Sequence, residues 1–114
     1  MNSNVALVGN PNCGKSSIFN ILTGLKQKVG NYPGITVDSK IGKMAMEDGS
    51  FIHLIDFPGA YSLHANTQDE FILTRSLIDS RDPYHPDAII YIADILLIEK
   101  QLLLLTQILD LEFP

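Results

Sequence analysis

Residues 9–16 read Gly9-Asn10-Pro11-Asn12-Cys13-Gly14-Lys15-Ser16, which is the spacing G-x-x-x-x-G-K-[ST]. The glycines let the backbone curl so that several N–H groups point inward. Lys15 adds a cation that can reach the outer phosphates of a nucleotide, and the hydroxyl of Ser16 can bind magnesium. The pattern therefore predicts a loop that binds phosphate groups.

The residues on either side of this loop test that prediction. An apolar strand pattern at 5–8 precedes it, and residues 17–23 carry Ile18, Phe19 and Leu22 at helical spacing before Gly24. A helix that starts at the loop adds a partial positive charge where phosphates would lie. A glycine-rich turn with an incidental lysine is the alternative, and the strand-loop-helix context favours the phosphate loop.

Composition limits the other functional classes. The chain has 114 residues, so we expect at most one domain, short for a complete nucleotide-binding fold. A net charge of -5 argues against a nucleic-acid partner. Cys13 is the only cysteine, which excludes an internal disulfide and a zinc site built from cysteines and suits a reducing cytosol. The apolar run 102–109 is too short to cross a membrane, and no signal peptide is expected.

A hairpin is predicted after the first helix. Residues 26–38 show no clear period and are expected to form a long loop. Partial alternation over 40–46, a turn at Asp48-Gly49 and an apolar run over 51–55 predict two antiparallel strands.

The second hairpin strand runs into Asp56-Phe57-Pro58-Gly59, a D-x-x-G pattern. A carboxylate at a strand end can hold a water ligand of magnesium, and a glycine N–H can meet a γ-phosphate. Because this motif follows a phosphate loop and one hairpin, we interpret it as part of the same site.

Two further helices and one buried strand complete the pattern. Thr67 is expected to cap a helix through Asp79, and residues 88–94 read as a strand covered on both faces. A last helix is predicted over about 98–111. The residues expected to face inward are Phe71, Leu73, Leu77 and Ile78 in the first helix, and Ile98, Leu102, Leu105 and Leu109 in the second. The predicted fold is α/β, a Ras-like P-loop NTPase with a mostly parallel sheet and one antiparallel hairpin strand.

Four stretches together carry a family resemblance that covers nearly the whole chain. The chain closely resembles the N-terminal G domain of the FeoB family, the bacterial ferrous iron transporters of the inner membrane. The most specific part is the V-G-N-x-P-G-x-T-V sequence, since other GTPases share the phosphate loop but not this element. The stretches are 9–16, 29–37, 56–63 and 86–89.

The resemblance implies GTP or GDP, Mg²⁺ and K⁺ as ligands. Lys15, Thr36 and Asn12 would be catalytic, with magnesium at Ser16, Thr36 and Asp56 and potassium at Asn12. The implied nucleotide contacts are Gly9, Asn10, Pro11, Asn12, Cys13, Gly14, Lys15, Ser16, Ser17, Gly34, Ile35, Thr36, Asp56, Phe57, Pro58 and Gly59.

The resemblance also implies a larger protein. The chain ends at Pro114, before the family's N-x-x-D motif for guanine, so residues 1–114 are expected to be a partial G domain. The implied partners are guanine nucleotide and the rest of the FeoB polypeptide, a helical regulatory domain and a membrane permease. The implied location is the cytoplasmic face of the inner membrane, and a homo-oligomer stays open.

Several positions depart from related patterns. Ala60 stands where Ras-like enzymes carry a water-positioning glutamine, so we expect slow hydrolysis with potassium near Asn12 supplying charge. Cys13 replaces a usual serine, and residues 94–102 differ from the family's D-A-[ST]-N-L-x-R-N-L pattern. Two alternatives remain: a ribosome or tRNA-modification GTPase of the Era or TrmE kind, and a non-catalytic nucleotide-binding remnant.

Overall fold

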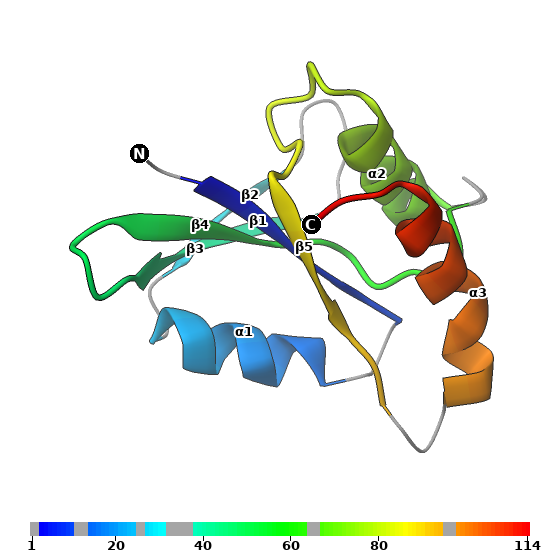
Figure 1. Cartoon of the computed structure of the whole chain (residues 1–114), viewed down its shortest axis with the longest axis horizontal. Helices are drawn as coiled ribbons and strands as arrows, with labels where there is room; N and C mark the ends of the chain where they lie inside the picture. Colours follow the sequence, from blue (N-terminus) through cyan, green and yellow to red (C-terminus); the bar gives the residue numbers. More distant parts are fainter. Residues whose placement is uncertain (1–2, 11–13, 25–26, 32–37, 64–66, 95–97) are drawn as a thin grey trace.

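Helices pack against one five-stranded sheet in this computed structural model (Figure 1). The structure describes residues 3–10, 14–24, 27–31, 38–63, 67–94 and 98–114. The elements are β1 (Ser3–Gly9), α1 (Lys15–Thr23), β2 (Gln27–Asn31), β3 (Asp38–Ala45), β4 (Phe51–Asp56), α2 (Gln68–Ile78), β5 (Ala88–Ile92) and α3 (Ile98–Asp110).

The sheet has the order β2-β3-β4-β1-β5. β1 pairs in parallel with β4 and with β5, whereas β3 pairs antiparallel with β2 and with β4. The predicted mixed sheet, mostly parallel with one antiparallel hairpin strand, is confirmed.

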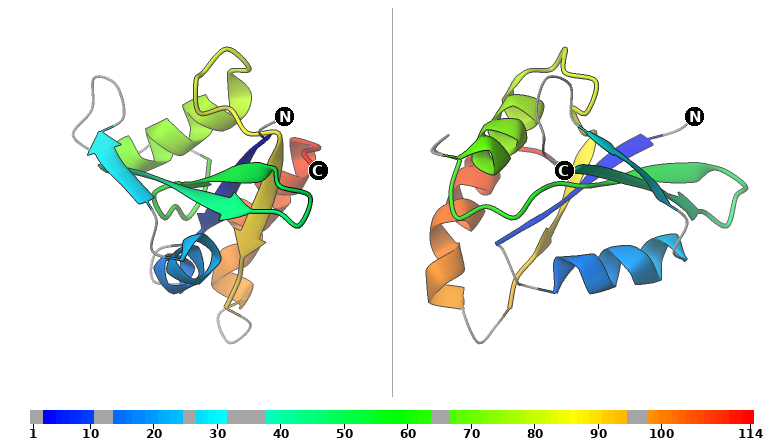
Figure 2. Two further views of the ribbon diagram at one scale, coloured as in Figure 1. Left: turned by 90° about the vertical axis from the view of Figure 1, so that its left-hand side faces the viewer. Right: turned by 180° about the vertical axis from the view of Figure 1, so that it is seen from behind.

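The interior strand β1 is covered on both faces. Helix α1 lies on one side of the sheet, and α2 and α3 lie on the other (Figures 1 and 2). Val5 and Leu7 pack with Phe19 on the α1 side, whereas Ala6 and Val8 join the core that includes α2 and α3. Successive side chains of a strand point to opposite faces, so a continuous apolar run is what a strand between two helical layers requires.

Helix α1 is flanked by Gly14 and Gly24, and its end at Gly24 is as the sequence predicts. Gly14 and Gly24 both adopt the left-handed conformation, with φ of 86° and 61°. The N–H of Gly24 bonds to carbonyl groups of the last turn, which is how a glycine commonly ends a helix. Phe19 anchors the helix to the sheet, because its side chain is almost fully buried.

The first helix after the D-x-x-G segment has the predicted cap but a different inward face. Thr67 accepts a hydrogen bond from the Glu70 N–H at 3.1 Å. Leu73 and Leu77 are buried as predicted, but the prediction was wrong for Phe71 and Ile78, which are 46% and 60% exposed. The buried face is centred on Ile72, Leu73, Ser76 and Leu77. The small polar residue Ser76 belongs to that face. A prediction that considers only apolar residues therefore places the buried face on a different side of the helix.

The inward stripe predicted for the last helix was also wrong. Leu102 and Leu109 are 46% and 66% exposed, and the buried residues are Gln101, Leu104 and Ile108. The Ile98 side chain lies outside the described residues, and Leu105 is half-buried. Because leucines lie on several sides of this helix, the sequence does not show which side faces the core. The side that faces the core includes the buried Gln101.

The predicted loop over 26–38 contains a strand that the sequence did not predict. β2 pairs with β3 at one edge of the sheet, with Gln27 opposite Gly42 and Asn31 opposite Asp38. Because an edge strand has a neighbour on one side only, it does not need the apolar pattern of a buried strand. At the other edge, the Ile89 N–H donates to the Pro114 carbonyl at 3.1 Å.

The packing of Phe19 generates a stability prediction. We expect Phe19→Ala to lower the free energy of unfolding by about 3–5 kcal/mol, because it empties a buried site between α1 and the sheet. Ile21→Ala is the matched control in the same helix, since Ile21 is 78% exposed, and should change it by less than about 0.5 kcal/mol. Urea unfolding followed by circular dichroism measures both, and equal losses would contradict the packing described.

Candidate nucleotide-binding site

The parallel pairing of β1 with β4 brings the two predicted motifs together. Leu7 is in register with Asp56, so β1 ends and β4 ends at the same edge of the sheet. β1 continues into the phosphate loop, and the helix after that loop begins at Lys15. Lys15 Nζ forms an ion pair with Asp56 Oδ1, and the two side chains are only 11% and 6% exposed.

The amino end of α1 points to this edge without a side-chain cap. Its N-cap is Gly14, and its first turn contains no acidic residue. N–H groups in a first helical turn have no carbonyl partners within the helix, and the helix dipole makes them attractive to anions. A Cβ at position 14 would meet nothing within 4 Å, so it is the left-handed backbone, not space, that favours glycine there.

Backbone hydrogen bonds hold the D-x-x-G segment against the end of β1. The Phe57 N–H donates to the Leu7 carbonyl at 3.2 Å, and the Ala60 N–H donates to the Gly9 carbonyl at 3.1 Å. Phe57 is fully buried. Pro58 and Gly59 lie between these two attachment points, so the segment is held beside the predicted phosphate loop.

The same segment is attached to α2 and α3 at Leu63, which the sequence did not predict. The Leu63 N–H donates to Gln107 Oε1 at 2.7 Å, and its carbonyl accepts from the Thr74 hydroxyl at 2.9 Å. One sequence signal is the polar pair Thr106-Gln107, which interrupts the apolar residues of α3. Both backbone groups of Leu63 are therefore satisfied by side chains from two different helices.

The oxygen ligands available at this site fit magnesium. Asp56 supplies a buried carboxylate, and the exposed Ser16 supplies a hydroxyl in the first turn of α1. Mg²⁺ prefers oxygen ligands and is usually bound by one or two carboxylates together with substrate phosphates. Within the described residues no three His, Cys, Asp or Glu side chains converge as a metal site.

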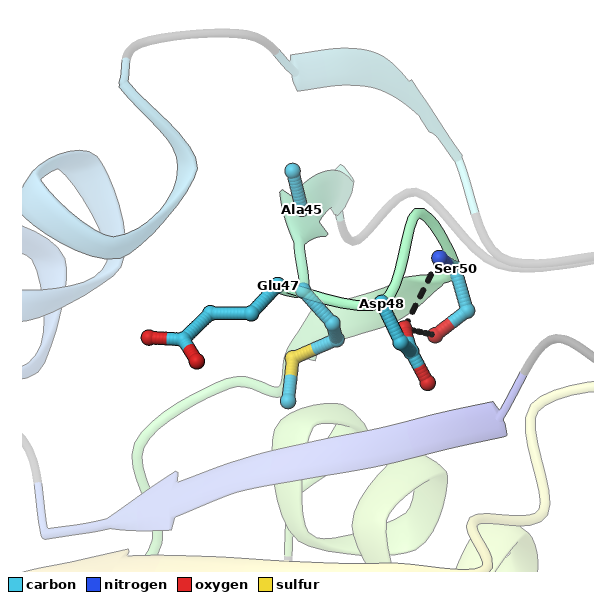
Figure 3. Close-up of a pocket in the computed structure, with 5 residues that line it drawn as sticks. Ala45, Glu47, Asp48 and Ser50 are labelled. Atoms are coloured by element: carbon cyan, nitrogen blue, oxygen red, sulfur yellow. Dashed lines mark hydrogen bonds between the residues drawn. The ribbon is translucent and has the colours of Figure 1, made fainter.

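A separate hollow of about 450 Å³ lies at the tip of the β3–β4 hairpin (Figure 3). Asp48 accepts hydrogen bonds there from the N–H and hydroxyl of Ser50 at 3.0 and 2.6 Å, and these bonds lower the pKa of Asp48. The Glu47 carboxylate points away from that of Asp48 (Figure 3). The hollow adjoins the start of β4, whereas Asp56 is the last residue of β4. The hollow is therefore separate from the predicted nucleotide site.

The structure places part of the predicted site and leaves the rest outside the described residues. The described members are Gly9, Asn10, Gly14, Lys15, Ser16, Ser17, Asp56, Phe57, Pro58 and Gly59. The members outside it are Pro11, Asn12, Cys13, Gly34, Ile35 and Thr36. Ala60 is buried, with 1% of its surface exposed, and its methyl group has no atom that could orient water.

Comparison with known proteins identifies the family. The family model FeoB_N, described as Ferrous iron transport protein B, matches residues 3–114. The chain belongs to this family. Fe(2+) transporter FeoB of Leptospira interrogans is 44% identical over 110 residues, which are 96% of this chain and 15% of that protein. Fe(2+) transporter FeoB of Legionella pneumophila is 43% identical over 112 residues, 95% of this chain and 14% of that protein.

Solved FeoB structures have the same fold. The G domain of T. maritima FeoB matches with a TM-score of 0.88 at 43% identity, over 97% of this chain and 67% of that one. The cytosolic domain of L. pneumophila FeoB matches with a TM-score of 0.88 at 43% identity, over 98% of this chain and 43% of that one. A GDP-bound mutant of the S. thermophilus FeoB G domain matches with a TM-score of 0.83 at 37% identity, over 95% of this chain and 39% of that one. The predicted family and fold are confirmed, and the Era or TrmE alternative is not favoured.

The attachment of Leu63 generates a prediction about this FeoB chain. Gln107→Leu should lower the free energy of unfolding by about 1–3 kcal/mol, because the half-buried Leu63 N–H loses its acceptor. Gln107→Glu is the matched control, since a carboxylate oxygen can still accept that hydrogen bond. Hydrogen exchange at the Leu63 amide should accelerate in Gln107→Leu alone. Equal protection of this amide in both variants would contradict the assignment.

Proposed function

We propose that this chain is the GTP-binding and GTP-hydrolysing domain of a ferrous iron transporter. The observation that carries the proposal is the convergence of Lys15, Asp56 and the uncapped amino end of α1 at one edge of the sheet. The chain spans about 15% of the length of the Fe(2+) transporters it matches, so iron transport belongs to the whole protein. Related domains described as GDP-bound support guanine nucleotide as the ligand.

The described residues would divide the binding of a nucleotide among them. The ammonium of Lys15 would neutralise the outer phosphates, and the first N–H groups of α1 would bind phosphate oxygens. Gly59 would offer a backbone N–H to the γ-phosphate. Ser16 and Asp56, with Thr36, would hold Mg²⁺, whose positive charge would offset the negative charge on the oxygens of the transferred phosphoryl group.

Hydrolysis by this domain should be slow without a further cation. Phosphoryl transfer depends on aligning water and on stabilising charge, and the buried methyl group of Ala60 does neither. We propose that K⁺ beside Asn12 supplies the charge that an arginine finger supplies elsewhere. The whole protein would carry this domain at the cytoplasmic face of the inner membrane, joined to a helical regulatory domain and a permease. No described helix is long and apolar enough to cross a membrane.

Lys15→Ala tests the proposed binding role. In the full-length protein with Mg²⁺, this change should weaken GDP binding about 30-fold, because a charge-assisted contact to phosphate contributes about 2 kcal/mol. Lys43→Ala is the matched control: Lys43 is exposed, and its ammonium lies over the Phe51 ring 4.8 Å from the centroid, at the β3–β4 hairpin. Isothermal titration calorimetry measures both affinities, with thermal melting as a check on folding. Unchanged GDP affinity in Lys15→Ala would refute the proposed site.

The proposed potassium role predicts a dependence on the monovalent cation. Phosphate release from GTP by the full-length protein should be about tenfold faster in K⁺ than in Na⁺ at equal ionic strength. The smaller Na⁺ would not fill the K⁺ position, and the loss of one stabilising group from a transition state costs at least that much. Asn12→Ala should abolish the difference, whereas Asn20→Ala, outside the loop, should preserve it. Equal rates in the two salts would rule out potassium assistance. No phosphate release in either salt would favour a non-catalytic remnant.

A further inference from the structure

The D-x-x-G segment is attached at its two ends by hydrogen bonds of different kinds. At its start, the N–H groups of Phe57 and Ala60 donate to backbone carbonyls of β1. At its end, the Leu63 N–H donates to Gln107 Oε1 at 2.7 Å, and the Leu63 carbonyl accepts from the Thr74 hydroxyl at 2.9 Å. Almost any residue can make a backbone bond, whereas the bonds at Leu63 require these two side chains. The two side chains therefore determine how the end of the segment is held.

Among residues 57–60, Gly59 is the one that can offer a backbone N–H to a phosphate. Pro58 has no N–H, and the N–H groups of Phe57 and Ala60 are bonded to β1. The proposed function gives the Gly59 N–H the γ-phosphate as its acceptor. GTP has a γ-phosphate and GDP does not, so the position of this N–H affects the choice between the two nucleotides.

Packing links the position of Leu63 to that of Gly59. Ala60 and Ser62 lie between them and are buried, with 1% and 7% of their surfaces exposed. Closely packed protein interiors transmit strain from one residue to the next. A displacement of Leu63 therefore reaches Ala60, whose N–H donates to the Gly9 carbonyl at 3.1 Å, and so reaches the adjacent Gly59.

The two side chains that hold Leu63 are themselves fixed by the core of the α2–α3 layer. Thr74 follows Leu73 in α2, and Gln107 precedes Ile108 in α3. Leu73 is fully buried, Ile108 is 6% exposed, and both belong to one hydrophobic cluster. Threonine is β-branched, so its first side-chain dihedral has few accessible values. The two helices therefore hold Leu63 in a defined position.

We propose that Thr74 and Gln107 are positioning residues for the γ-phosphate. By holding Leu63, they keep the Gly59 N–H beside the phosphate loop, where it strengthens the binding of GTP and not that of GDP. Both act through the backbone of the D-x-x-G segment and not by touching the nucleotide. The inference rests on the proposed function and adds two residues, one from each helix, that determine the preference for a nucleoside triphosphate.

The proposal predicts a loss of affinity for the triphosphate that GDP does not share. In the full-length protein with Mg²⁺, Thr74→Val combined with Gln107→Leu should weaken binding of the non-hydrolysable GTP analogue GMPPNP about tenfold. This loss is expected if release of Leu63 leaves the Gly59 N–H in place about one tenth of the time. Isothermal titration calorimetry measures the GMPPNP and GDP affinities. Lower stability of the variant would reduce both alike, so the ratio of the two affinities is the decisive quantity.

Matched variants separate positioning from a general disturbance of the helices. Thr106→Val removes an exposed hydroxyl of α3 that donates to the Leu103 carbonyl at 2.9 Å, and it should leave the ratio unchanged. Thr74→Ser combined with Gln107→Glu keeps a donor and an acceptor for Leu63 and should restore the ratio to within about twofold. If thermal melting shows that the first double variant does not fold, Thr74→Val alone should lower the ratio about threefold.

The outcomes for the positioning residues and for the proposed function are distinct. If the unmodified full-length protein binds neither GDP nor GMPPNP, the proposed function fails, and the positioning role fails with it. If it binds both, but removal of the two side chains leaves the ratio unchanged or raises it, the positioning role alone is overturned. A fall that Thr106→Val shares, or that the conservative pair of changes does not reverse, also overturns it. A fall that is reversed by the conservative pair and absent from Thr106→Val supports the positioning role.

Discussion

The parallel pairing of β1 with β4 is the constraint on which the rest of this structure depends. It ends both strands at one edge of the sheet, and the two segments that leave that edge carry Lys15 and Asp56. The pairing is possible because β1 is apolar on both faces and lies between α1 and the α2–α3 layer. Carboxyl ends of parallel strands are where ligands of open α/β sheets usually bind, and the geometry of this chain follows that rule.

The attachments of the D-x-x-G segment show how the site is linked to the α2–α3 layer. Phe57 and Ala60 bond to the backbone of β1, and Leu63 bonds to Thr74 of α2 and Gln107 of α3. A shift in this segment therefore cannot occur without disturbing hydrogen bonds to α2 or α3. Leu63 thus connects the D-x-x-G segment to both α2 and α3.

Sequence reasoning predicted the parts of this molecule that depend on local pattern. It identified the β1-loop-α1 unit, the hairpin and the cap at Thr67, because glycine conformations, alternation and capping act over a few residues. It missed β2, which is an edge strand and needs no apolar pattern. It misplaced the faces of α2 and α3, where apolar residues occur on several sides and the polar Ser76 and Gln101 are buried. The Lys15–Asp56 contact joins residues 41 positions apart. The sequence motifs predict which ligand each of these side chains binds, but they do not predict that the two side chains contact each other.

Gln101 joins the end of β5 to α3. Its side-chain oxygen accepts from the Asp94 N–H at 2.9 Å, and its carbonyl accepts from the Tyr91 hydroxyl at 3.2 Å. One buried residue thus fixes the distance between the end of β5 and the start of α3 from both directions. Gln101 therefore connects β5 to α3 through two separate hydrogen bonds, one made by its side chain and one by its backbone carbonyl.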